Sequence, residues 1–179
     1  MAEGRRQIAQ GLGHPPVPMT APASPVTGVK DFKQGDSRQQ VVKWFTAYDN
    51  IRHEAQMTPA EKSQSHELMT AIISGNDGNK AAGKILLQKM IARYTRAISQ
   101  MGSLKSIPQT AALQSGYSNY FRTGRDYFSR YLKALNQNSP ENVLSAMQEG
   151  RSKLGDLDSS NKALDKKLRK QYDIVPYRW

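Results

Sequence analysis

The sequence predicts an all-α fold, a bundle of four to five helices, and three observations support this. Apolar residues recur every three or four positions over most of residues 36–172, the spacing that places them on one face of a helix. The four prolines beyond residue 30 all lie at or near expected helix boundaries, where proline is tolerated. Strong alternation of apolar and polar residues, the pattern of a half-buried strand, is absent from the 179 residues.

The chain divides into an arm, a body and a tail. Residues 1–35 are expected to be an extended arm, because five of the nine prolines lie among the first 30 residues. Few large apolar residues accompany them, so burial cannot offset the entropy of ordering this segment. Residues 36–172 form the expected helical bundle, and residues 173–179 form a short extended C-terminal tail.

The first two expected helices have clear start signals. Asp36 or Ser37 can cap the first helix, since Asp and Ser accept hydrogen bonds from free backbone N–H groups. Its apolar face carries Val41, Phe45, Tyr48, Ile51 and Ala55. The second helix begins with a capping box at residues 58–61, with Pro59 at the first helical position. It is expected to end at Gly75.

Three further helices are expected along the rest of the bundle. They cover about residues 80–101, about residues 108–136, and a segment that starts at Ser139 and continues past residue 154. The stretch GDLDSS at residues 155–160 is rich in turn-forming residues, so it could interrupt the last helix.

The fourth expected helix has the most distinctive composition. One seam follows alternating steps of four and three residues: Leu113, Tyr117, Tyr120, Gly124, Tyr127 and Tyr131. Gly116 and Gly124 would let another helix approach closely at the level of Tyr120. Helical spacing favours a core role for this stripe. The alternative is an aromatic and basic surface on which nucleic-acid bases stack.

Positive charge is concentrated in the middle of the chain. The net charge is +11, and residues 75–136 hold ten Lys and Arg against two Asp and Glu, a net +8. A candidate basic surface on the third and fourth helices comprises Lys89, Arg93, Arg96, Arg122, Arg125, Arg130 and Lys133. Such a surface attracts nucleic acid, anionic lipid or an acidic protein.

No motif of a catalytic, cofactor or metal site is convincing. Residues 78–84, GNKAAGK, fit the start of a P-loop, but Ile85 replaces the Ser or Thr that holds magnesium and no strand precedes the glycines. The chain has no cysteine, and its three histidines are not in a ligand spacing that zinc or di-iron sites use. The sequence therefore predicts no catalytic residue, no cofactor and no metal.

Neither a membrane span nor a signal peptide is expected. No stretch approaches the roughly 20 apolar residues that a membrane helix needs. The arginine pair near the N-terminus has no apolar segment behind it, which argues against a secretory signal. The sequence does not determine a compartment. The cytoplasm or the inside of a viral or other particle is the expected setting.

The C-terminal tail ends in residue types that are common at interface hot spots, namely Tyr177, Arg178 and Trp179. This tail either folds back on its own bundle or docks into a neighbouring chain. We expect a non-enzymatic structural or assembly protein, a small basic subunit that binds other protein chains through its terminal arms. A virion or another large particle would fit.

Two other interpretations stay open. The chain could bind nucleic acid without sequence preference through residues 75–136, where its positive charge is concentrated. It could also be a small helical enzyme or cofactor carrier whose site leaves no motif in the sequence.

Overall fold

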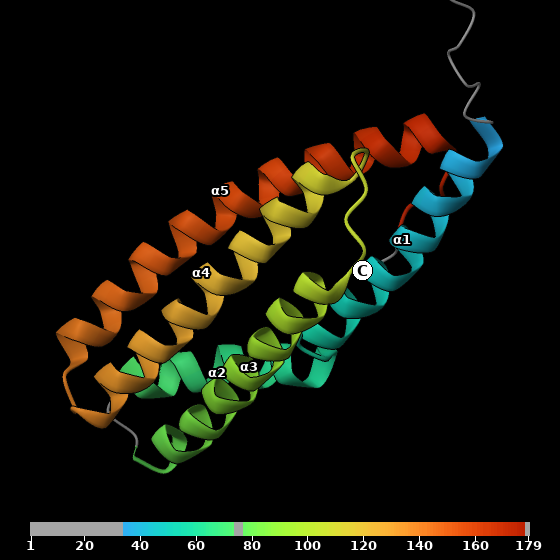
Figure 1. The fold of residues 1–179 in the computed structure, drawn as a ribbon. Coiled ribbons are helices and arrows are strands. Elements are labelled where there is room, and N and C mark those ends of the chain that lie inside the picture. Colours follow the sequence, from blue (N-terminus) through green and yellow to red (C-terminus); the bar gives the residue numbers. More distant parts are fainter. Residues whose placement is uncertain (1–33, 74–76, 178–179) are drawn as a thin grey trace, which may run out of the picture. The chain divides into compact units, whose positions relative to one another are not determined.

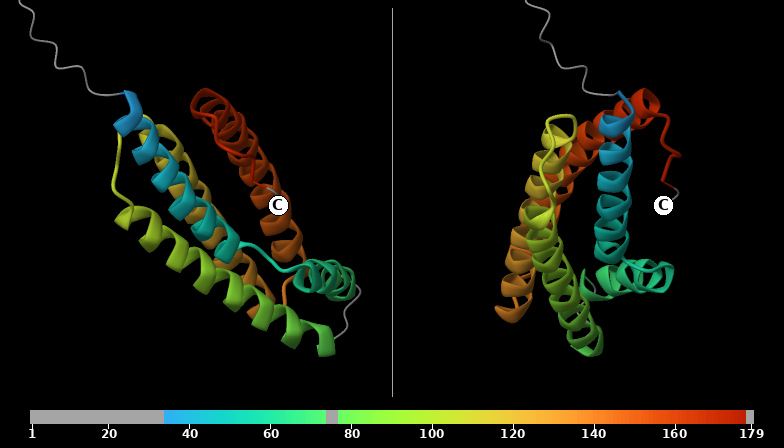
Figure 2. Two further views of the ribbon diagram at one scale, coloured as in Figure 1. Left: turned by 90° about the vertical axis from the view of Figure 1, so that its right-hand side faces the viewer. Right: turned by 45° about the vertical axis from the view of Figure 1, so that its right-hand side comes forward.

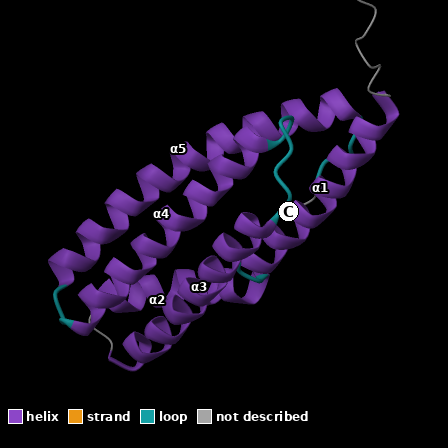
Figure 3. Ribbon diagram, viewed as in Figure 1, coloured by secondary structure: helices purple, strands orange, loops and turns teal. Residues whose placement is uncertain are grey.

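Five α-helices make up the regular structure of the described residues. The computed structural model describes residues 34–73 and 77–177. Its helices are α1 (Gln34–Ala55), α2 (Pro59–Ile73), α3 (Asp77–Ser103), α4 (Ala111–Asn136) and α5 (Pro140–Tyr172). Figure 3 shows helices and loops, without a strand, in this part of the chain. The all-α prediction is confirmed.

The helices of residues 34–177 pack mainly through α3, α4 and α5. α4 lies against both α3 and α5, and α3 also contacts α1 and α2 (Figures 1 and 2). The expected arm at residues 1–35 lies outside the described residues, except that Gln34 and Gly35 belong to α1. Gly75, the expected end of the second helix, also lies outside them.

Capping interactions fix the starts of α2 and α5 where the sequence predicts them. The Glu61 N–H donates to the Thr58 hydroxyl at 3.2 Å, and the Thr58 N–H donates to the Glu61 carboxylate at 3.0 Å. This reciprocal pair is the expected capping box. At α5, the Asn142 N–H donates to the Ser139 hydroxyl at 3.4 Å, with Pro140 at the first helical position.

Two boundaries differ from the sequence-based expectation. α4 begins at Ala111, after a turn, and not near Pro108. Residues 155–160 do not interrupt α5, which is a single helix of 33 residues. One glycine costs a helix only about 1 kcal/mol relative to alanine. Packing of α5 on α4 and the Asp158–Lys162 ion pair, one helical turn apart, outweigh that cost.

The aromatic stripe of α4 is largely core. Tyr117, Phe121 and Tyr131 are buried, and Tyr120 and Phe128 are partly buried against the same core clusters. Other helices supply the rings around them: Tyr94 of α3 and Phe121 have centroids 5.3 Å apart in an edge-on contact, and Tyr48 of α1 and Tyr117 have the same separation. The core interpretation of this stripe is therefore confirmed for these rings.

Glycines on α4 and α5 make room for large side chains of adjacent helices. A Cβ atom at Gly124 would lie 2.2 Å from the Tyr94 ring, and a Cβ atom at Gly116 would lie 2.1 Å from the Asn161 side chain of α5. The predicted close approach is thus made by two different helices. The sequence did not single out Gly150 of α5, where a Cβ atom would lie 1.9 Å from the Tyr127 ring.

Candidate functional site

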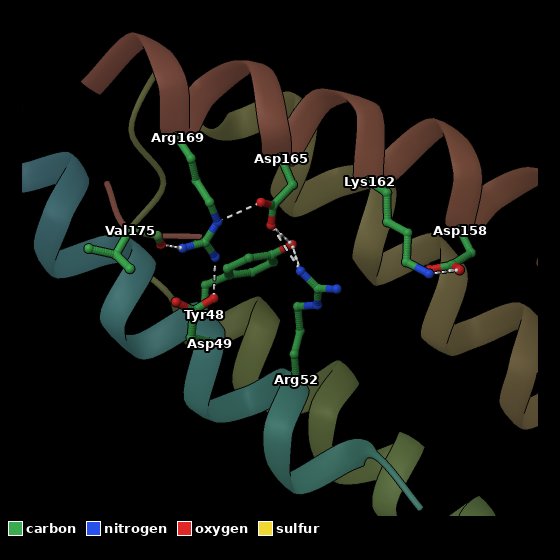
Figure 4. A network of polar contacts seen from close by, with 8 residues as sticks. All are labelled: Tyr48, Asp49, Arg52, Asp158, Lys162, Asp165, Arg169 and Val175. Atoms are coloured by element: carbon green, nitrogen blue, oxygen red, sulfur yellow. Dashed lines mark hydrogen bonds and ion pairs between the residues drawn. The ribbon is translucent and has the colours of Figure 1, made fainter. Parts of the chain in front are cut away.

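A buried polar network links α1 to α5 (Figure 4). Arg52 of α1 donates through Nη1 to the Tyr48 hydroxyl at 2.7 Å and to Asp165 Oδ2 of α5 at 2.9 Å. The Tyr48 hydroxyl donates to the same Asp165 oxygen at 2.9 Å. These three side chains form a closed set of hydrogen bonds, and the two bonds to Asp165 join residues more than 110 positions apart in sequence.

Arg169 extends this network to the C-terminal tail. Its Nε donates to Asp165 Oδ1 at 2.5 Å, and its Nη2 pairs with the Asp49 carboxylate of α1. Its Nη1 donates to the Val175 carbonyl at 2.9 Å, as Figure 4 shows. One arginine therefore holds α5, α1 and the tail together.

The charges of the network compensate one another. Two arginines face two aspartates, and each guanidinium also lies over an aromatic ring: Arg52 over Tyr117 at 4.2 Å and Arg169 over Phe45 at 4.5 Å. A buried ion pair is tolerated when further hydrogen bonds accompany it. Here Arg52 also donates to the Tyr48 hydroxyl, and Arg169 also donates to the Val175 carbonyl. These hydrogen bonds and ion pairs hold α1 and α5 in position relative to each other.

Burial shifts the acid–base properties of two members. Desolvation raises the pKa of Tyr48 far above its ordinary value, although the Arg52 charge opposes the shift. Tyr48 therefore stays protonated and can donate to Asp165. Desolvation also raises the pKa of Asp49, and its hydrogen bond with Arg169 partly offsets the rise.

A groove of about 560 Å³ lies beside the network, between α5 and the tail; we term it the α5 groove. Its lining residues are Arg52, Lys162, Asp165, Lys166, Arg169, Lys170, Asp173, Ile174, Pro176 and Tyr177. Arg52 and Lys162 also line a second hollow of about 310 Å³ that reaches the aromatic residues of α3 and α4. The volume of the α5 groove is within the range of ligand sites.

Residues 173–177 of the tail contact helices of the same chain. The Ile174 N–H donates to the Arg169 carbonyl at 2.9 Å, and Arg38 of α1 donates to the Tyr172 carbonyl at 3.0 Å. The Tyr177 ring lies 6.5 Å from the His53 ring. The other two candidate contact residues, Arg178 and Trp179, lie outside the described residues.

The candidate basic surface divides into paired and unpaired residues. Lys89, Arg96, Arg122 and Lys133 are exposed and make no ion pair with another described residue. Because α3 and α4 are packed with Tyr94 against Gly124, Arg96 and Arg122 lie at about the same level of the helix pair.

The other three residues of this candidate surface are in ion pairs. Arg93 is half-buried and donates to both carboxylate oxygens of Glu61 at 2.6 and 2.9 Å, so it joins α3 to α2. Arg125 pairs with its neighbour Asp126 at 2.8 Å, and Arg130 pairs with Glu149 at 3.5 Å. Sequence spacing alone did not reveal these partners.

The structure also bears on the motifs that the sequence analysis set aside. α3 begins at Asp77, so residues 78–84 are helical and not a phosphate-binding loop. Within the described ranges, no group of three or more His, Cys, Asp or Glu side chains is placed to hold a metal ion. None of the helices in the same ranges combines the length and the apolar character that spanning a membrane requires.

Comparison of this chain with protein-family models, with characterised proteins and with solved structures found no match.

Proposed function

We propose that this chain is a non-enzymatic assembly subunit, a helical body that binds another protein chain at its C-terminal tail and the α5 groove. The observation that carries the proposal is the composition of this groove. Its lining combines Lys166 and Lys170 of α5, which make no ion pair with another described residue, with apolar residues of the tail, including Tyr177. Protein interfaces combine such an apolar centre with a charged rim.

The buried network supports this proposal because it positions the tail. Arg169 and the Val175 carbonyl are joined at 2.9 Å, and Arg38 donates to backbone carbonyls at the end of α5. A surface that is ordered before binding loses less conformational entropy when a partner docks. The network thus acts as the support of a binding surface.

Truncation of the tail tests the proposal. A chain that lacks residues 176–179 keeps Ile174, and the new C-terminal carboxylate of Val175 can still accept from Arg169, so its helical circular dichroism and melting temperature should change little. In the cells that express the chain naturally, partner chains that co-purify with the full-length protein should be lost from the truncated protein. A Lys153→Ala variant, changed at an exposed position of α5 outside the groove, is the control. Equal recovery of partners with the truncated and full-length chains would refute the proposal.

A second candidate function is nucleic-acid binding without sequence preference. The unpaired residues Lys89, Arg96, Arg122 and Lys133 favour it, because exposed cations neutralise phosphates. Most rings of α4 pack inward, so this surface offers charge without a row of stacking rings.

Salt dependence tests this second candidate. Fluorescence anisotropy with labelled mixed-sequence RNA should show affinity that falls steeply between about 50 and 200 mM salt. The double variant Arg96→Glu/Arg122→Glu should bind more weakly at every salt concentration. Affinity that is absent, or equal in the double variant and wild type, would remove this candidate.

A further inference from the structure

We propose that the α5 groove binds an extended acidic peptide segment of a partner chain. Carboxylates of the segment would lie against Lys166 and Lys170, and an apolar side chain would lie against Ile174 and Tyr177. The inference rests on the proposed assembly function and names the chemistry of the partner.

The groove carries positive charge along α5. Lys162, Lys166 and Lys170 are exposed and follow one another at steps of four along α5, so they share one face of the helix. Lys162 pairs with Asp158 at 2.6 Å, whereas Lys166 and Lys170 make no ion pair within the described part of the chain. Two adjacent cations therefore face the groove without a counter-charge.

The acidic residues of the groove do not neutralise these lysines. Asp165 is buried and accepts hydrogen bonds from Arg52 and Arg169. Asp173 Oδ2 lies 3.5 Å from Nη2 of Arg38 in α1. Because both carboxylates have arginine partners, the groove keeps an excess of positive charge that complements an acidic ligand.

The spacing of the lysines matches an extended peptide. Residues four apart on a helix are separated by about 6 Å along its axis. In an extended chain, side chains on the same face repeat every two residues, or about 7 Å. Carboxylates at alternate positions of an extended segment would therefore meet Lys166 and Lys170 in turn.

The apolar wall favours a peptide over nucleic acid. Ile174, Pro176 and Tyr177 form this wall, which includes two aliphatic residues and one aromatic ring. Single-stranded nucleic acid binds best where several rings stack with successive bases. Aliphatic or aromatic side chains of a peptide fit a wall of this composition. The hydrogen bonds that hold the tail in place also hold the wall.

Selection from a library of displayed random linear peptides tests the inference. The full chain is the target, and the double variant Lys166→Glu/Lys170→Glu is used for counter-selection. Selected peptides should be enriched in Asp and Glu at alternate positions, next to an aliphatic or aromatic residue. The double variant should bind a synthetic selected peptide about tenfold or more weakly, since two favourable charge contacts become repulsive.

A matched control separates local contacts from net charge. The double variant Lys153→Glu/Lys167→Glu makes the same charge change at two exposed lysines of α5 that do not line the groove. Its affinity for the peptide should fall clearly less than that of Lys166→Glu/Lys170→Glu, because its changed side chains do not line the groove. Equal losses in both double variants, or no acidic enrichment among selected peptides, would overturn the inference. The inference would also be overturned if no peptide binds and mixed-sequence RNA binds instead, more weakly to the Lys166→Glu/Lys170→Glu variant than to the Lys153→Glu/Lys167→Glu variant.

These experiments distinguish failure of the peptide inference from failure of the proposed assembly function. Suppose that natural partners still bind the Lys166→Glu/Lys170→Glu chain and the chain lacking residues 176–179, whereas selected peptides no longer bind the Lys166→Glu/Lys170→Glu chain. The groove then binds acidic peptides as inferred, and the proposed assembly function fails. If partners are lost with the tail but no acidic peptide is selected, the proposed function holds and this inference fails.

Discussion

Arg52 of α1 and Asp165 of α5 form an ion pair, with 2.9 Å between Nη1 and Oδ2, and the two side chains are only 5% and 11% exposed. Asp165 also accepts from Arg169, which binds Asp49 and the tail. The carboxylate of Asp165 is thus the anion that both buried arginines share. The arrangement of α1, α5 and the tail depends on it.

Replacing this carboxylate should therefore destabilise the chain strongly. Asp165→Asn removes the charge that pairs with both Arg52 and Arg169, and breaking a buried ion pair costs about 3–5 kcal/mol in free energy of unfolding. Asp156→Asn changes an exposed aspartate of the same helix and should shift that free energy by no more than about 0.5 kcal/mol. Urea denaturation measures both values. Equal stabilities of the two variants would contradict the structural role of Asp165.

Two glycine substitutions should change the stability of the fold in opposite directions, because Gly124 of α4 contacts a ring of α3 and Gly155 of α5 faces open space. Gly124→Ala places a methyl group against the Tyr94 ring, and overpacking of this kind costs about 1–3 kcal/mol. Gly155→Ala, inside α5, meets open space and should stabilise the helix by up to about 1 kcal/mol. Thermal melting of both variants checks this. A Gly124→Ala protein as stable as the Gly155→Ala protein would show that Tyr94 can move aside without cost.

Glu61 should make stability depend on pH. Its hydrogen bonds with Arg93, and then with the Thr58 N–H, lower its pKa from 4.5 to about 2. Because the folded-state pKa is below the unfolded value, the carboxylate stabilises the fold above about pH 4.5, and that contribution is lost as pH falls toward 2. The free energy of unfolding of wild type should exceed that of Glu61→Gln at pH 6, and the difference should shrink by pH 3.

The Arg93→Gln background is the control for this pH effect. Without the guanidinium, the main cause of the low Glu61 pKa is gone. In that background, the effect of Glu61→Gln should vary less between pH 3 and pH 6. A pH dependence that persists unchanged without Arg93 would assign it to other groups.

The helical start of α3 predicts that the chain does not bind nucleotide specifically. Residues 78–84 lie inside this helix, so their backbone N–H groups cannot wrap around a phosphate as a P-loop does. Isothermal titration with magnesium-ATP should give no saturable binding at micromolar concentrations. Micromolar affinity that disappears in Lys84→Ala would show that this segment holds phosphate after all.

Local signals in the sequence predicted much of the fold. The capping box at Thr58 and Glu61, the proline at the start of α5 and the aromatic stripe of α4 each depend on residues close together in the chain. Gly116 and Gly124 also indicated close helix approach, although not which helices approach them. Short-range patterns of this kind follow directly from helix geometry.

The buried network was missed because its pairings between α1 and α5 join distant parts of the chain. Arg52 and Asp165 are 113 residues apart, and spacing cannot assign partners over that distance. One signal was present: Arg52 lies four residues after Tyr48, on the apolar face of α1, where a charged residue requires a buried partner. Arg93 was likewise expected in the solvated surface, because its partner Glu61 belongs to another helix.

Site-specific photo-crosslinking from Val175 tests the central claim, that the tail and the α5 groove hold a partner chain, most directly. Val175 is 81% exposed and lies between the groove-lining residues Ile174 and Pro176, so a benzophenone amino acid at this position would be close to a partner docked in the groove. In the cells that express the chain naturally, we predict crosslinks to another protein that are lost with Lys166→Glu/Lys170→Glu and kept with Lys153→Glu/Lys167→Glu. Crosslinks to no other protein, or crosslinks that are unaffected by the groove variant, would contradict the account.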